Sequence, residues 1–221
     1  MRGAKGRRQQ AAHAIVKAVA PNPATNKLPT MTESTPVVIM IDAIHDNVHS
    51  IPANALKVAG YVTGTSDIEW TAADWARFST TAKVRVNQWP GSNPLHGDVL
   101  DVEPGAWTNQ GAAEACVERK KNGLQINLYS SQDNLTPLLN ACIAVGVTTG
   151  NLWVANYNLS IEEATSLVVH RYGPWPIQAV QWASPSSNPN TLIPGSKLTL
   201  KEGNCDLSAT APGWLSGIPA G

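Results

Sequence analysis

The chain has 221 residues, of which 43% are hydrophobic and 14% are charged, a composition that suits one sizeable globular domain. No apolar run approaches the ~18 residues that a membrane-spanning helix needs, so the sequence predicts no membrane span. The net charge is zero, but six of the sixteen Lys and Arg residues and none of the sixteen acids lie in residues 1–30. The remainder of the chain is therefore acidic.

Residues 1–36 are expected to form a basic N-terminal extension and a linker rich in Pro and Thr. The run AAHAIVKAVA is interrupted by His13 and Lys17, so it fits a short amphipathic helix better than the core of a signal peptide. A basic segment can bind an acidic protein, an anionic surface or nucleic acid, or stay a solvated tail. Nucleic-acid binding is disfavoured because no aromatic residues are interleaved. Met1 and Met31 are both candidate starts of translation.

From residue 37 onward, apolar runs alternate with helical patterns. The apolar runs predict strands at 37–42, 56–62, 83–89, 97–103, 124–130, 151–157, 177–183 and 203–208. The helical patterns, with capping residues or acids near their starts, lie at 71–80, 108–123, 131–146 and 160–173. This alternation indicates right-handed βαβ units and a parallel sheet.

We therefore predict that residues 37–221 form one domain, an irregular α/β barrel similar to a TIM barrel. It should have about eight strands and about five helices, because the connection near 184–202 has few helical signals. A doubly wound open sheet is the alternative. It is disfavoured because neither G-x-G-x-x-G nor G-x-x-x-x-G-K-[ST] occurs.

Four acids fall on three of the predicted strands. Asp42 ends the first strand, Asp101 and Glu103 end the fourth, and Asp206 lies on the last. Active sites of such barrels lie at the carboxyl ends of the strands, so we expect the four acids at one rim. Neighbouring carboxyl groups push each other's pKa values apart, and one can then serve as a general acid while the other stays ionised. That division is what cleavage of a glycosidic bond needs. For each acid taken alone, a rim salt bridge or a helix cap is the alternative.

Amide and aromatic side chains follow other strand ends. They are Gln88 and Trp89 after the third strand, Tyr129 on the fifth, Asn156 and Tyr157 on the sixth, and Gln181 and Trp182 on the seventh. Aromatic faces stack on sugar rings and amides hydrogen-bond to hydroxyl groups, so this mixture is typical of a sugar-binding surface. Each residue alone could equally fill the mouth of the barrel. Gln88 and Trp182 are included among the candidate substrate-binding residues on this ground.

Other chemistries are less well supported. The cysteines are odd in number and form no C-x-x-C pair, which favours buried free thiols over disulfides or zinc; they are Cys116, Cys142 and Cys205. His45 and His49 have i,i+4 spacing but lack the Glu of H-E-x-x-H, so we expect no metal. No G-x-S-x-G motif for a serine hydrolase occurs. No cofactor is expected.

Six segments carry a resemblance to a known family. They are VVIMIDA, GDVLDVE, INLYSS, LWVANYN, AVQWAS and NCDLS, in this order over residues 37–208. With D-x-E on the fourth strand and an Asp on the first and last, the chain resembles the lysozyme-type muramidases of glycoside hydrolase family 25, in their actinobacterial and actinophage branch. The resemblance implies an irregular barrel that cleaves the β-1,4 bond after N-acetylmuramic acid in bacterial peptidoglycan.

The same resemblance implies roles for individual residues. Glu103 would be the general acid, and Asp101 would orient the 2-acetamido group of the substrate or stabilise the positive charge that it develops. Asp42 and Asp206 would complete an acidic floor. The residues that match groove-lining positions are Tyr129, Trp153, Tyr157 and Gln181.

The expected partner is bacterial cell-wall glycan. Because the signal-peptide pattern is unconvincing, we expect a phage product that acts at the cell wall, as a tail-associated virion component or a lysis protein. Residues 1–30 would then contact other virion proteins. The alternative is a catalytically silent module of a phage virion, structural or glycan-binding, that retains the barrel.

Overall fold

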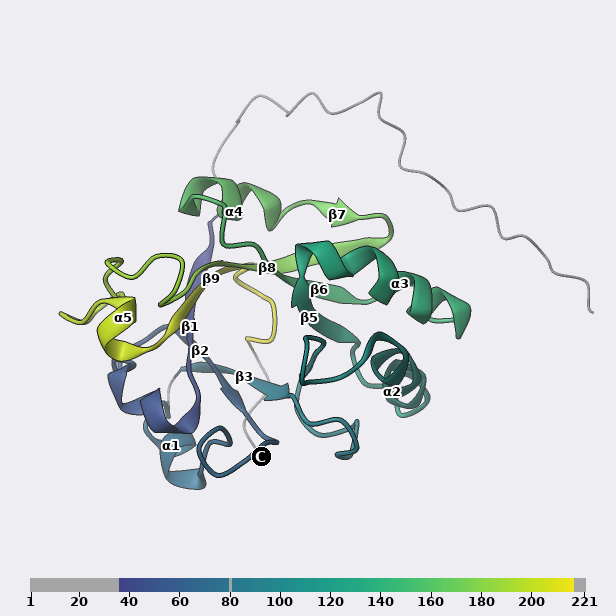
Figure 1. Cartoon of the computed structure of the whole chain (residues 1–221), viewed down its shortest axis with the longest axis horizontal. Helices are drawn as coiled ribbons and strands as arrows, with labels where there is room; N and C mark the ends of the chain where they lie inside the picture. The colour runs from purple at the N-terminus through teal and green to yellow at the C-terminus, as the bar shows by residue number, and fades with distance from the viewer. Residues whose placement is uncertain (1–35, 80, 217–221) are drawn as a thin grey trace, which may run out of the picture. The chain divides into compact units, whose positions relative to one another are not determined.

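The computed structural model describes residues 36–79 and 81–216 (Figure 1). The predictions for the basic extension, its short helix and its virion contacts lie outside the described residues. Within the described part of the chain, no helix is both long enough and apolar enough to span a membrane.

Eight strands close into a barrel. They are β1 (Val38–Asp42), β2 (Lys57–Tyr61), β3 (Ala82–Asn87), β4 (Val99–Asp101), β5 (Asn127–Ser131), β6 (Asn151–Ala155), β8 (Trp175–Ala183) and β9 (Asp206–Thr210). The strands are neighbours in the order β6-β5-β4-β3-β2-β1-β9-β8, and the pairing of β6 with β8 joins the two ends. A further two-residue strand, β7 (Arg171–Tyr172), pairs only with β8, as a hairpin. The predicted irregular α/β barrel is confirmed.

One strand corrects the prediction of a parallel sheet. β9 runs antiparallel to both β1 and β8, whereas β1 to β6 and β8 pair in parallel. The connection from β8 to β9 holds only the four-residue helix α5 (Leu200–Gly203) and no crossover helix. The chain therefore re-enters the sheet at the end where it left. As a result Asp206, the first residue of β9, lies directly opposite Asp42, the last residue of β1.

Helices cover the outside of the barrel. They are α1 (Ala72–Ala76), α2 (Asn109–Lys121), α3 (Leu135–Ala144), α4 (Ile161–Leu167) and α5, with 3-10 helices η1 (His45–Ser50) and η2 (Gln132–Asn134). Capping boxes fix the starts of α1, α4 and α5. All four predicted helices are shorter than predicted, and α1 and α4 have half of the predicted length. The segment predicted as one helix at 160–173 ends at Leu167, and a turn at Gly173, with φ +61°, then folds β7 back on β8.

Apolar side chains fill both the layer under the helices and the interior of the barrel. The segment after β9 crosses the middle of the barrel (Figure 1, yellow) and places Trp214 and Leu215 in the interior. The Trp214 indole N–H donates to Asn127 Oδ1 over 3.2 Å, and the buried Lys57 ammonium donates to the Trp214 carbonyl. Because Lys57 and Asn127 begin β2 and β5, this segment closes the amino-terminal end of the barrel.

The close approach of Trp70 to β2 gives the first prediction. A Cβ atom at Gly60 would lie 2.3 Å from Cδ2 of Trp70, whose indole N–H is held by the Ala43 carbonyl at 2.8 Å. Gly60→Ala should therefore lower the free energy of unfolding by about 1–3 kcal/mol, through overpacking. Urea unfolding of the full chain measures this loss. Gly213→Ala is the matched control, because its Cβ would meet nothing within 4 Å. Equal urea midpoints for the two variants would contradict the packing argument.

Candidate functional site

Every strand of the barrel supplies a polar or aromatic side chain to one mouth. The residues are Asp42 (β1), Tyr61 (β2), Gln88 (after β3), Asp101 and Glu103 (end of β4 and beyond), Tyr129 (β5), Tyr157 (after β6), Gln181 (β8) and Asp206 (β9). The four predicted acids are thus brought together. Asp206 reaches this mouth because β9 is antiparallel, so its amino end lies beside the carboxyl ends of the other strands.

Gln181 links two of the acids. Its amide nitrogen donates to Asp206 Oδ2 over 2.9 Å and to Asp42 Oδ2 over 3.3 Å. Its amide oxygen accepts from the Tyr157 hydroxyl over 3.0 Å and from the Tyr129 hydroxyl. The two phenols therefore orient the amide so that its N–H groups face the carboxylates.

The two acids of the D-x-E motif have different surroundings. Asp101 is the last residue of β4 and is buried, with Gln88 as a neighbour that lowers its pKa against the effect of burial. Glu103 lies beyond the end of the strand and is only partly buried, with Tyr129 as a neighbour. The chain turns directly after Glu103, whose carbonyl accepts from the Ala106 N–H over 3.0 Å. This turn holds Glu103 at the mouth, while Asp101 stays inside the sheet.

Burial raises the pKa of all four carboxyl groups. For Asp42 burial is the largest cause, followed by the charges of Asp206, Asp101 and Glu103. Burial and the charge of Glu103 raise the pKa of Asp206 to about 7, against the hydrogen bond from Gln181. Burial raises the pKa of Glu103, against a smaller lowering by the neighbouring Tyr129 hydroxyl. The cluster therefore retains protons at pH values where exposed carboxyl groups have lost theirs.

Two oxygens of this cluster have no partner. Oδ1 of Asp42 and Oδ1 of Asp101 are buried and accept no hydrogen bond from any described residue. Buried polar atoms are nearly always hydrogen-bonded, and exceptions call for an explanation such as a ligand group. Both atoms belong to predicted site residues, so the orphaned acceptors point to a place where a ligand completes the site.

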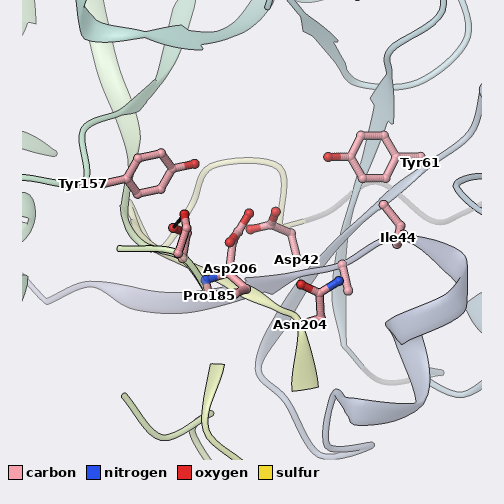
Figure 2. Close-up of a pocket in the computed structure, with 10 residues that line it drawn as sticks. Asp42, Ile44, Tyr61, Tyr157, Pro185, Asn204 and Asp206 are labelled. Carbon is pink, nitrogen blue, oxygen red and sulfur yellow. Dashed lines mark hydrogen bonds between the residues drawn. The ribbon is translucent and has the colours of Figure 1, made fainter. Parts of the chain in front are cut away.

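Two cavities open at this mouth. One, of about 380 Å³, is lined by Asp42, Asp206, Tyr61 and Tyr157 together with Ala43, Ile44, Ser184, Pro185, Ser186 and Asn204. Figure 2 shows the Tyr61 and Tyr157 hydroxyls directed toward one another across it, with Asp42 and Asp206 between them. The other, of about 330 Å³, is lined by Glu103 and by Trp107, Thr108, Asn109, Ser131 and Asn134 among others. We refer to them as the Asp42 cavity and the Glu103 cavity.

The structure separates two predicted substrate-binding residues from this mouth. Trp153 is buried one layer below, with its ring centroid 4.7 Å from that of Tyr129 and its N–H donating to Ser208 Oγ over 3.0 Å. Trp182 packs against the outer hydrophobic layer, at a bulge in β8 that follows Gln181. Of the six predicted substrate-binding residues, Tyr157 alone is among the residues that line either cavity. Both side chains pack against hydrophobic layers of the barrel, and their part in substrate binding stays a prediction.

Sequence reasoning missed other lining residues. Tyr61 ends β2 just as Asp42 ends β1, so its position at a strand end was the available signal. Ser184 and Ser186 lie in a connection that the sequence identifies only as a loop, and Asn204 has a left-handed backbone, with φ +48°. No local pattern in the sequence points to these three residues.

The weaker candidates lie elsewhere. The Nδ1 atom of His45 lies 2.7 Å from Asp74, which also caps α1. Residues 36–79 and 81–216 contain no group of three or more His, Cys, Asp and Glu side chains arranged to hold a metal ion. The three cysteines are buried and free, as predicted.

Comparisons of the chain with models of protein families, with curated proteins and with solved structures find no match. The resemblance to glycoside hydrolase family 25 therefore rests on the six sequence segments alone.

The raised pKa of Asp206 gives a prediction about stability. Between its ordinary value of 3.8 and about 7, the folded protein binds this proton more tightly than the unfolded chain does. Stability from this group is therefore full at low pH and falls as the pH rises through this range. Asp206→Asn should remove this fall, so the variant gains stability over the wild type as the pH rises from about 4 to about 7.

The measurement is urea unfolding of the full chain at several pH values. Asp133→Asn, at an exposed position of η2, should follow the wild type throughout. A constant difference between Asp206→Asn and the wild type across this range would contradict the assignment of the proton to the buried cluster.

Proposed function

We propose that the barrel is a glycoside hydrolase whose reaction takes place at the mouth formed by the strand ends. The observation that carries the proposal is the gathering of four carboxyl groups there, all with raised pKa values and two with an unpartnered buried oxygen. Carboxyl pairs in unlike surroundings are what proton transfer to and from a glycosidic bond requires.

Glu103 is the proposed general acid. Glu103 is less buried than Asp101 and lines a cavity. Because burial raises its pKa, it can carry a proton to the leaving oxygen. As the bond from the anomeric carbon to that oxygen breaks, the oxygen takes the proton of Glu103. Water then adds to the anomeric carbon, and its proton returns to Glu103.

The other acids stabilise positive charge. The sugar develops an oxocarbenium-like charge in the transition state, and preorganised carboxylates in a partly dry site lower its energy. Asp101, beside Gln88, is placed to orient a 2-acetamido group or to face this charge. Asp42 and Asp206, held by Gln181, supply negative potential at the floor when a developing positive charge displaces their protons.

The finer proposal takes its substrate from the sequence resemblance. The chain would cleave the β-1,4 bond after N-acetylmuramic acid in bacterial peptidoglycan, as a tail-associated or lysis protein of a phage. Tyr61 and Tyr157, which face each other across the Asp42 cavity, support a carbohydrate ligand, because phenol groups offer both an apolar face and a hydroxyl.

Peptidoglycan digestion tests the proposal. The full-length wild type should release fragments with new reducing-end muramic acid, identified by mass. Glu103→Gln keeps the size of the side chain but cannot donate the acid proton, so release should fall by about 10²- to 10⁴-fold. Glu114→Gln, on the exposed side of α2, is the matched control and should retain full release.

Two other results would contradict parts of the proposal. If the folded wild type releases nothing from a wall that another lysozyme digests, the hydrolase proposal fails. The barrel is then a glycan-binding or structural module. Equal release by wild type and Glu103→Gln would overturn the role of Glu103 alone.

A further inference from the structure

Among the described residues, the mouth of the barrel gathers acidic groups without a basic counterpart. No Lys, Arg or His is among the residues that line the Asp42 cavity or the Glu103 cavity. The ion pairs of the described residues lie elsewhere, at His45–Asp74, Arg85–Asp98 and Lys121–Glu118. Among the described residues, the groups that offset the effect of burial on the pKa of these acids are neutral: Gln88 for Asp101, Tyr129 for Glu103 and Gln181 for Asp206. An anionic ligand would therefore be repelled, and a cationic one attracted.

Asp42 is the acid whose free oxygen can meet such a ligand. Its side chain is more than nine-tenths buried, it lines the larger of the two cavities, and its Oδ1 atom has no hydrogen-bond partner among the described residues. Asp206 lies opposite it in the β1–β9 ladder and lines the same cavity. A donor bound between these carboxyl groups would fill the vacant acceptor and offset the repulsion between them.

The rest of the lining indicates a sugar rather than a simple alkyl ammonium. Two phenols face each other across the cavity, and its wall carries the hydroxyls of Ser184 and Ser186 and the amide of Asn204. A cavity of about 380 Å³ is in the size range of small-molecule sites and is wide for a single lysine side chain. Several polar groups around the rim can each take a ring hydroxyl, which an alkyl chain does not offer.

We propose that the Asp42 cavity binds an amino sugar whose nitrogen is a free ammonium, held between Asp42 and Asp206, in preference to its N-acetylated or anionic counterpart. This inference rests on the proposed function, because it names the substrate class of the same site. Asp101 lies outside this cavity, so an acetylated sugar at Asp101 and a free amine at the neighbouring sugar are compatible. The preferred substrate is then a partly de-N-acetylated β-1,4 glycan.

Binding of an ammonium should release protons. The titratable groups around Asp42 are the carboxyl groups of Asp206, Asp101 and Glu103, the phenols of Tyr61, Tyr129 and Tyr157, and the thiol of Cys205. These carboxyl groups keep protons in the free protein because burial and mutual repulsion oppose ionisation. A bound positive charge reverses that balance, so a carboxyl proton passes to the buffer as the ammonium enters.

Calorimetric titration of the full chain tests this coupling. The probes are a β-1,4-linked glucosamine tetramer and its fully N-acetylated counterpart, at about pH 6 and physiological salt, each in two buffers that differ in ionisation enthalpy. The glucosamine tetramer should bind at least about tenfold more tightly, as expected for a charge-assisted contact. It should also show a buffer-dependent heat that corresponds to proton release.

Two variants and one further probe make the test specific. Asp42→Asn should abolish the preference and reduce the proton release, whereas the exposed Asp133→Asn should change neither, which excludes attraction to the acidic surface as a whole. Spermidine supplies ammonium groups without a sugar and should bind at least about tenfold more weakly than the glucosamine tetramer. Tetramers that bind equally well, or spermidine that matches the glucosamine tetramer, would overturn the inference.

Failure here is distinguishable from failure of the proposed function. Digestion of fully acetylated wall with no preference for the glucosamine tetramer would leave the hydrolase proposal in place and remove the amine selectivity. Selective, proton-coupled binding without digestion of either acetylated or partly de-N-acetylated wall would support the amino-sugar site and leave a binding module.

Discussion

The antiparallel pairing of β9 with β1 is the constraint on which the candidate site depends. A parallel final strand would place Asp206 at the opposite end of the barrel from Asp42, since its position is the first of the strand. The antiparallel ladder instead sets the two carboxyl groups side by side, and the Gln181 amide from the next strand bridges them. Two strands and one amide thus hold together charges that would otherwise separate, and the barrel tolerates this because the groups keep protons.

The site is built in two layers that divide its chemistry. Glu103 stands beyond its strand in a turn and borders an open cavity, so its proton can reach a ligand. Asp42 and Asp101 are fixed within strands and largely buried, and each keeps one unpartnered oxygen that a ligand can meet. The more exposed acid is thus suited to proton transfer, and the more buried acids are suited to charge stabilisation. Residues in a turn can adapt to a ligand, which suits proton transfer. Residues in a strand are held rigidly, which suits the stabilisation of charge.

Much of this arrangement could be predicted from periodicity alone. The eight strands of the barrel and the meeting of Asp42, Asp101 and Glu103 follow from apolar runs and from the rule that parallel strands end at one face. The direction of β9 could not be predicted, because it depends on whether a crossover helix forms between residues 184 and 205. The burial of Trp153 could not be predicted either. Its position on a strand indicates which face it takes, but not that the Trp214 segment fills the space beneath it.

That filling segment links the two ends of the barrel mechanically. The ring centroids of Trp214 and Trp153 are 6.2 Å apart, and those of Trp153 and Tyr129 are 4.7 Å apart. The Tyr129 hydroxyl then reaches Gln181. A continuous column of side chains therefore runs from the closed end to the amide that aligns the acids. A smaller side chain in place of Trp214 would leave space beneath Trp153, and the loss of packing would extend through this column to Gln181.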